Sequence, residues 1–115
     1  KLVNEPRFFV TQKDLFHYLQ NPAEKLYDVI LIDIDHSPHE NLDSSNLPFY
    51  TRDGLSQVRS HLEEKGVLAV WSSAPNDSFV STLGNEFSEV RVEEIRWHND
   101  LIDKDLSDYV FLARG

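Results

Sequence analysis

The sequence predicts an α/β domain with a mostly parallel sheet flanked by helices. Three stretches carry consecutive apolar side chains without polar alternation, at residues 29–32, 67–71 and 109–113. Such runs are typical of strands that are covered on both faces. Helical patterns with one apolar face separate the first two runs and follow the second. We therefore expect strands and helices to alternate along most of the chain, with a central strand at about 28–33.

Composition limits the class of protein. The chain has 115 residues, of which 40% are hydrophobic, so one small domain with one core is expected. A net charge of −9 argues against a nucleic acid or an anionic membrane as partner, since both are bound through clustered Lys and Arg. The absence of cysteine excludes disulfides and thiolate metal sites, and it fits a reducing, cytoplasmic location. No apolar run reaches the length of a membrane span, and the lack of any Met suggests a fragment of a longer protein.

The first predicted elements are a strand and a short helix. Residues 7–10 form an apolar run after Pro6 that predicts a strand. Thr11 and Asp14 have the spacing of a capping box, with an acid in place of the usual Glu or Gln. The helix that follows has apolar positions at 15, 16, 18 and 19 and should end before Pro22. After the strand at 28–33 comes a long loop at 35–50, and loops of that length are often functional.

Two further helices surround the second buried run. The first should start at Thr51, whose hydroxyl can cap it, and end at the terminator Gly66. Its apolar face would carry residues 55, 58 and 62. The strand at 67–71 follows, and then a helix at 77–86 with Phe79, Val80 and Leu83 turned inward. Gly84 weakens the prediction for the last turn of that helix.

The end of the chain has a different pattern. Residues 89–97 alternate imperfectly, as expected for an outer strand, whereas the run at 109–113 is continuous and apolar. The link from 98 to 108 shows no helical face, so no crossover helix is available to make these two strands parallel. The sequence therefore predicts an antiparallel pair of strands at the C-terminus.

Two carboxylates at the end of the first buried run are the best candidates for a functional site. Asp33 and Asp35 come directly after residues 29–32, and ligands of open α/β sheets bind at the carboxyl ends of the strands. Asp35 also lies near His36, His39 and Glu40, which together resemble a metal cluster. Because nothing in a loop fixes their geometry, we expect no metal site there. His17 and His61 are expected on helices, partly exposed and without a chemical role.

Several stretches together resemble a known family. The runs 14–19, 27–33, 49–53 and 65–72 look like the second half of the spermidine synthase-like branch of the class I S-adenosylmethionine-dependent methyltransferase fold. The resemblance implies a partial Rossmann-like domain that lacks the first two strands. It implies S-adenosylmethionine or its decarboxylated form as cofactor of the parent protein, with a small-molecule acceptor. It also implies that Asp14 contacts the adenine, that Asp33 lies at the cofactor and acts on the attacking amine, and that Asp35 holds the acceptor cation.

The chain also departs from that family. Aminopropyltransferases carry an Asp-x-x-Asp-Pro pattern, whereas Asp33 and Asp35 are separated by one residue. The acceptor is therefore left open between a polyamine and another small molecule. The glycine-rich turn that holds the methionine part of the cofactor, and the acid that holds its ribose, precede the third strand in the family and are missing here. We expect the chain to be inactive and to bind the cofactor poorly when it is alone.

Other classes of protein share parts of the pattern. Residues 30–35 resemble the nucleophile motif of haloacid-dehalogenase-type phosphatases, with Ser72 or Ser73 as a second phosphate contact, and response-regulator receivers are of similar length. The remaining catalytic residues of those families cannot be placed in this sequence. A catalytically silent interaction module is the third alternative.

The resemblance also predicts the order of the strands. In the family order, 3-2-1-4-5-7-6, the strand at 7–10 would be number 3, two missing strands away from the strand at 28–33. The remaining order would be 28–33, 67–71, 109–113 and 90–96, with only 109–113 antiparallel to the others. The bare edge of the strand at 28–33 should then pair either with residues 7–10 or with a second copy, giving a homodimer through an exposed sheet edge.

Overall fold

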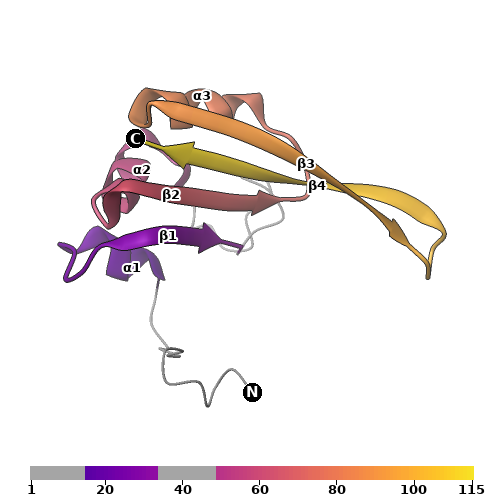
Figure 1. Ribbon diagram of the computed structural model, residues 1–115, viewed down its shortest axis with the longest axis horizontal. Coiled ribbons are helices and arrows are strands. Elements are labelled where there is room, and N and C mark those ends of the chain that lie inside the picture. The colour runs from indigo at the N-terminus through magenta and orange to yellow at the C-terminus, as the bar shows by residue number, and fades with distance from the viewer. Residues whose placement is uncertain (1–14, 34–48) are drawn as a thin grey trace, which may run out of the picture.

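The computed structural model describes residues 15–33 and 49–115, and these parts of the chain form three helices and four strands (Figure 1). The elements in order are α1 (Leu15–Gln20), β1 (Tyr27–Ile32), α2 (Arg52–Arg59), β2 (Leu62–Ser72), α3 (Asp77–Glu86), β3 (Glu89–Asn99) and β4 (Lys104–Arg114). No helix in the described ranges has the length and apolar character needed to cross a membrane.

The four strands form one mixed sheet in the order β1-β2-β4-β3. β1 and β2 are parallel, whereas β4 lies antiparallel to both of its neighbours. This confirms the predicted order. β3 lies at the edge opposite β1, and β4, which contains residues 109–113, is antiparallel to the other described strands. The strand predicted at 7–10 lies outside the described residues.

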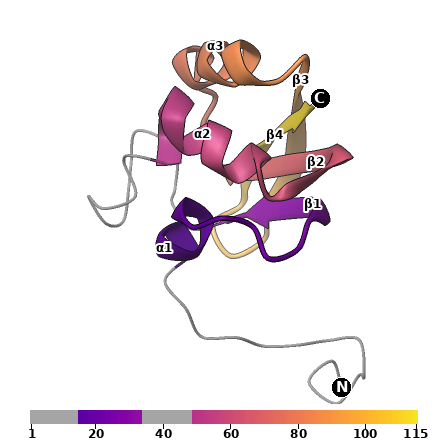
Figure 2. The ribbon, with the colours of Figure 1, turned by 90° about the vertical axis from the view of Figure 1, so that its left-hand side faces the viewer.

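All three helices pack on one face of the sheet (Figure 2). The buried cluster between helices and sheet combines side chains from every layer: Ile32 of β1, Leu68 and Val70 of β2, Phe111 and Ala113 of β4, Leu19 of α1, Leu55 and Val58 of α2, and Phe79 and Leu83 of α3. We call this side of the sheet the covered face. Leu68 and Val70 of β2, and Phe111 and Ala113 of β4, are alternate residues of their strands, as the pleat of a strand requires.

β1 is one of the two edge strands of the described sheet, so the prediction that it is the central strand is wrong for this part of the chain. The prediction that it is covered on both faces is also wrong. Ile32 is buried, but Val29 and Leu31 are 60% and 62% exposed. The physical reason is that α1, α2 and α3 all lie on the same side of the sheet, so no described helix covers the other (Figure 2).

α2 begins as the sequence predicts and ends earlier. The Thr51 hydroxyl accepts a hydrogen bond from the Gly54 amide at 3.1 Å and caps the helix. Leu55 and Val58 are buried, but the helix stops at Arg59. Leu62, predicted on the helix face, is instead the first residue of β2.

Gly66 lies inside β2 and is not the helix terminator that the sequence predicts. A Cβ atom at this position would come within 2.9 Å of the Tyr27 carbonyl oxygen and 3.0 Å of the Glu63 carbonyl oxygen. The glycine therefore allows the backbone of β2 to pass close to the start of β1. The register between the two strands shifts here, between Tyr27 and Val29.

α3 confirms the predicted helix at 77–86. Phe79 and Leu83 are buried, and Val80 packs against the core. The Asn76 side chain caps the helix by accepting a hydrogen bond from the Phe79 amide at 3.0 Å. Gly84 lies within the last turns of the helix and does not end it.

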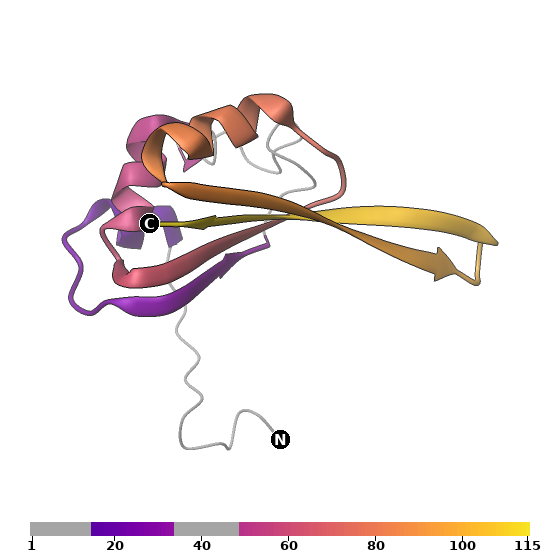
Figure 3. The same cartoon turned by 45° about the horizontal axis from the view of Figure 1, so that its top comes forward.

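β3 and β4 continue beyond the rest of the sheet as a two-stranded arm (Figure 3). β2 pairs with β4 only from Tyr109 onward, so residues 95–99 and 104–108 pair only with each other. The link at 98–108 is not helical, as predicted, and it forms the outer part of this hairpin. Leu101 and Ile102 in its turn are exposed.

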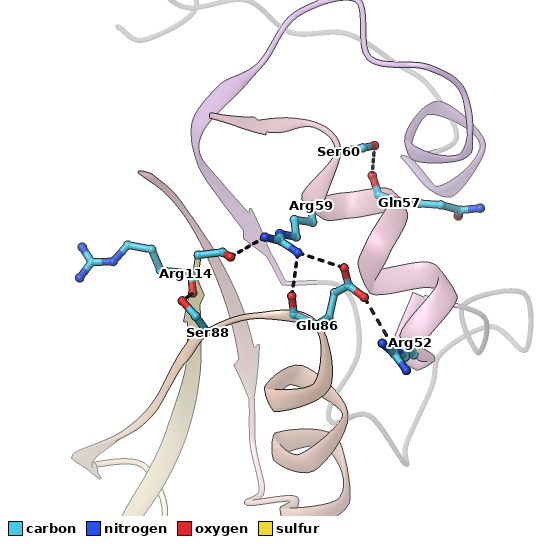
Figure 4. Close-up of polar contacts among 8 residues, drawn as sticks. Arg52, Gln57, Arg59, Ser60, Glu86, Ser88 and Arg114 are labelled. Carbon is cyan, nitrogen blue, oxygen red and sulfur yellow. Dashed lines mark hydrogen bonds and ion pairs between the residues drawn. The ribbon is translucent and has the colours of Figure 1, made fainter. Parts of the chain in front are cut away.

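A polar network joins the ends of the elements on the covered side (Figure 4). The Arg59 guanidinium donates hydrogen bonds to the Glu86 carbonyl oxygen at 3.1 Å and to the Gly115 carbonyl oxygen at 2.6 Å. The Glu86 carboxylate also lies 3.8 Å from Arg52 Nε. Arg59 thereby links the end of α2 to the end of α3 and to the residue that follows β4.

Candidate functional site

The candidate site lies where the parallel strands β1 and β2 end. Ile32, the last residue of β1, pairs with Val70 of β2, so Asp33 follows β1 beside the last residues of β2. Its side chain is exposed. Among the described residues, no hydrogen bond or ion pair holds the Asp33 carboxylate. This geometry fits the predicted position of Asp33 at the carboxyl end of a parallel strand.

The other predicted site residues lie outside the described residues. Asp35 and Asp14 belong to the parts of the chain at 34–48 and 1–14, as do His36, His39 and Glu40. The structure therefore places Asp33 alone among the three predicted aspartates, and the predicted roles of the other two stay predictions.

The end of β2 is fixed by a local turn. Ser72 is fully buried, and its hydroxyl donates a hydrogen bond to the Ala74 carbonyl oxygen at 2.6 Å. The same oxygen accepts a hydrogen bond from the Ala74 amide at 3.1 Å. These contacts turn the chain from β2 toward the cap of α3 at Asn76. The Ser72 hydroxyl, named above as a phosphate contact in the phosphatase alternative, is thus engaged in shaping this turn.

An aromatic cluster supports the amino-terminal ends of α2 and α3 next to this edge. The Tyr50 ring packs edge-on against Phe49 and against Phe79 of α3, with centroid distances of 4.9 and 5.4 Å. Phe79 in turn meets Phe111 of β4 at 5.3 Å. No pattern in the sequence predicted a role for Tyr50. The signal available for it was the pair of aromatic residues just before the cap of α2.

The hollows and the shifted pKa values lie away from Asp33. Hollows lie over Val67 and Leu112, on the arm around Trp97, and beside Arg59, and Asp33 lines none of these three. A hydrogen bond with the Tyr27 hydroxyl raises the pKa of Tyr18. Hydrogen bonds from Ser107 and Arg96 lower the pKa of the Glu94 carboxyl on the arm. Neither shift marks the predicted site.

No group of residues in the described ranges has the arrangement of a metal site. The turn of the arm does bring together a histidine and acids. His98 Nδ1 lies 2.8 Å from Asp105 and Nε2 lies 3.2 Å from Asp103, and both aspartates are almost fully exposed. These contacts are ion pairs or hydrogen bonds at a solvated hairpin tip.

His61 is buried, which corrects the prediction that it is partly exposed on a helix. It follows the last turn of α2, and its Nδ1 lies 2.9 Å from the Gln57 carbonyl oxygen. Its Nε2 is a buried atom with no hydrogen-bond partner among the residues that the structure describes. The backbone carbonyl of His61 accepts a hydrogen bond from the Tyr27 amide at 2.8 Å. The residue therefore joins α2 to the start of β1, at the end of the sheet opposite Asp33.

Comparison with known proteins finds similarity both in sequence and in structure. The chain is 36% identical over 66 residues to a polyamine aminopropyltransferase from Oceanobacillus iheyensis, a match that covers 57% of this chain and 12% of that protein. The fold matches the crystal structure of human methyltransferase-like protein 13 in complex with SAH. That match has a TM-score of 0.68 and 22% identity, and it covers 96% of this chain and 51% of that one.

No protein-family model matches the chain. The chain spans about half of the solved methyltransferase-like chain and a small part of the aminopropyltransferase. The sequence match indicates partial homology, whereas the structural match, at 22% identity, establishes the fold alone. The chain is thus partly homologous to a polyamine aminopropyltransferase and shares the α/β fold of a methyltransferase-like protein.

Proposed function

We propose that this chain supplies the acceptor side of an S-adenosylmethionine-dependent transferase domain with a Rossmann-like, class I methyltransferase-type fold. The proposed reaction is aminopropyl or methyl transfer to an amine-type or other small acceptor. One observation carries the proposal: an exposed aspartate follows a parallel strand, and among the four described strands β4 is the one that runs antiparallel to its neighbours. The sequence similarity to a polyamine aminopropyltransferase supports it.

The proposed cofactor is S-adenosylmethionine or its decarboxylated form, and the human methyltransferase-like protein was solved with SAH. The cofactor supplies a carbon activated by a sulfonium. Asp33 fits the acceptor side of such a site, because an exposed carboxylate at the end of a strand can reach a cationic amine. Asp14 is proposed to contact the adenine, by resemblance to the family. Because the match covers half of the solved chain, a complete cofactor site is proposed only for a longer protein.

The proposed residues each have a defined task toward the acceptor. An amine is protonated near neutral pH and must lose a proton before its lone pair can attack. Asp33 takes the proton from the acceptor nitrogen as general base. Asp35 holds the acceptor through charge-assisted hydrogen bonds to its cationic groups. Most of the rate enhancement would come from placing the nitrogen in line with the reacting carbon.

The test is an Asp33→Asn substitution in the full-length protein, with transfer measured from both forms of the cofactor to polyamine and other acceptors. Loss of a general base should lower turnover by about 10² or more. Asp28→Asn is the matched control, because Asp28 is an exposed aspartate on the same strand, five positions earlier. A rate that Asp33→Asn leaves unchanged would remove Asp33 from the mechanism.

A further inference from the structure

The turn of the β3–β4 arm places one imidazole among three carboxylates. His98 Nδ1 lies 2.8 Å from the Asp105 carboxylate, and Asp105 is also the residue that pairs with His98 across the two strands. His98 Nε2 lies 3.2 Å from the Asp103 carboxylate and 3.7 Å from the Asp100 carboxylate. Both nitrogens of the ring therefore face anions.

This arrangement is specific for one protonation state of the ring. A neutral imidazole donates from one nitrogen and carries a lone pair on the other, whereas the imidazolium donates from both. In the neutral state, one lone pair of His98 would point at a carboxylate. The contacts on the two sides of the ring can therefore be made together only by the protonated form, as charge-assisted hydrogen bonds.

The two other basic side chains of the arm do not take the place of His98. Directly paired residues share a side of the two-stranded ladder. Lys104 pairs with Asn99, so by the alternation of a strand it lies on the side opposite His98. Arg96 shares the side of His98, but its Nε contacts the Glu94 carboxylate at 3.3 Å.

The surroundings of the arm supply no further charge to this ring from the described residues. Asp108 pairs with Ile95 and therefore lies on the side opposite His98. The outer part of the arm projects away from the helices and from β2 (Figure 3). In the described part of the chain, His98 is thus the cation that meets the three aspartates of the turn.

The backbone of the turn is held at two points. At its start, the Asn99 side chain accepts a hydrogen bond from the Leu101 amide at 3.0 Å, a contact without charge. Near its end, Asp103 has a φ of +50°, in the left-handed region that few residues other than glycine adopt. The carboxylate of this residue is the one that lies 3.2 Å from His98 Nε2. Protonation of His98 therefore bears directly on the residue with the least favourable backbone conformation.

We propose that residues 98–105 form a pH-sensitive device, in which the protonated His98 ring holds the turn of the arm closed on its aspartates. Loss of the proton removes a hydrogen bond to a carboxylate and leaves three carboxylates close together without their cation. The turn then opens, while the inner part of β4 stays paired with β2. The device controls how firmly Leu101 and Ile102, both exposed in the turn, are held in one conformation.

The direction of the pH dependence follows from the two kinds of group. The closed turn needs a protonated imidazole and ionised carboxylates. These groups ordinarily titrate at about pH 6.5 and about pH 3.9. The turn should therefore be most ordered at about pH 5 and should open as the pH rises through the titration of His98.

The test measures the protection of the Leu101 amide by hydrogen exchange in NMR, relative to an unstructured peptide at the same pH. Leu101 reports on the turn because its amide is bonded within it. Ion pairs on an exposed surface are individually weak, so we expect a moderate effect. Protection should fall about 5-fold between about pH 5.5 and about pH 8.

Three variants separate the charge of His98 from its shape. His98→Gln should have low protection at both pH values, whereas His98→Arg should keep high protection at both, because a guanidinium stays charged and donates to more than one carboxylate. His17→Gln is the matched control, since His17 is an exposed histidine on α1. It should keep the pH dependence of the wild type. Circular dichroism of each variant checks that it folds.

Two results would overturn the proposal. One is a wild-type protection that stays constant over this pH range. The other is a pH dependence that persists in His98→Gln, because it would then arise from another group. Neither result depends on the transferase proposal, since the measurement needs no cofactor and no acceptor.

Discussion

The two faces of the sheet are built from the same four strands, yet they have opposite surroundings. On the covered face, Ile32, Leu68 and Phe111 are at most 2% exposed beneath the helices. On the opposite face, which no described helix covers, Val29 and Leu31 of the same β1 run are mostly exposed. An apolar run allows a strand to be buried on both sides, and the placement of the helices decides which side is buried.

The largest difference between the two faces should be the loss of stability when an apolar side chain is truncated. Phe111→Ala removes a ring that is 1% exposed and packs edge-on against Phe79, so it should lower the free energy of unfolding by about 4 kcal/mol. Leu31→Ala on the opposite face should change it by less than about 0.5 kcal/mol. Urea denaturation at a protein concentration low enough to keep the chain monomeric measures both. Equal losses would mean that the face opposite the helices is already covered in the monomer.

A smaller difference in stability is expected when polar contacts are removed from the two faces. Arg59→Ala removes the hydrogen bonds to the Glu86 and Gly115 carbonyl oxygens on the covered side, and we expect a loss of about 1 kcal/mol because this guanidinium is partly solvated. Arg114→Ala removes an ion pair with Glu89 whose partners are both 54% exposed. It should cost less than about 0.5 kcal/mol in the monomer. A larger loss for Arg114 than for Arg59 in the same urea measurement would contradict the comparison.

The smallest effect concerns the Tyr18–Tyr27 hydrogen bond beside α1, which joins two hydroxyl oxygens 3.0 Å apart. This bond is the main cause of the raised pKa of Tyr18, above its usual value of 10.0. A raised pKa means that the folded state favours the neutral phenol. The stabilisation is therefore fully present below pH 10.0 and is lost as the pH rises through the folded-state pKa.

The measurement is the urea midpoint as a function of alkaline pH, for the wild type and for Tyr27→Phe. The wild type should lose slightly more stability above that range than the variant, which cannot form the bond. Parallel curves for the two proteins would show that the bond contributes nothing to the pH dependence.

Local signals in the sequence predicted the elements well. The Thr51 cap and the bounds of α3 follow from side chains that act within one helical turn, and the strand order followed from the resemblance. The end of α2 was missed because Leu62 continues the helical period, whereas tertiary structure assigns it to β2. The exposure of Val29 and Leu31 could not be predicted from their own residues, because it depends on the side chosen by three separate helices.

The position of Asp33 was predicted, whereas its role in a site stays a prediction. Asp33 lies where its place after a buried run indicated, because the carboxyl end of a parallel strand is determined by local sequence and direction alone. The contacts of Asp33 could not be predicted in the same way. They depend on how distant segments meet at the end of the sheet, which no pattern near Asp33 encodes. Tyr50 shows the same difficulty, since its role appears only when α3 brings Phe79 against it.

The position of β4 between β2 and β3 has a consequence for the order of folding. β3 has no neighbour in the described sheet except β4, and β4 comes later in the chain. During synthesis, β1 and β2 can pair as soon as both have left the ribosome, but β3 must wait for the strand that follows it. If the chain were interrupted within β4, both β3 and β4 would therefore be detached from the sheet.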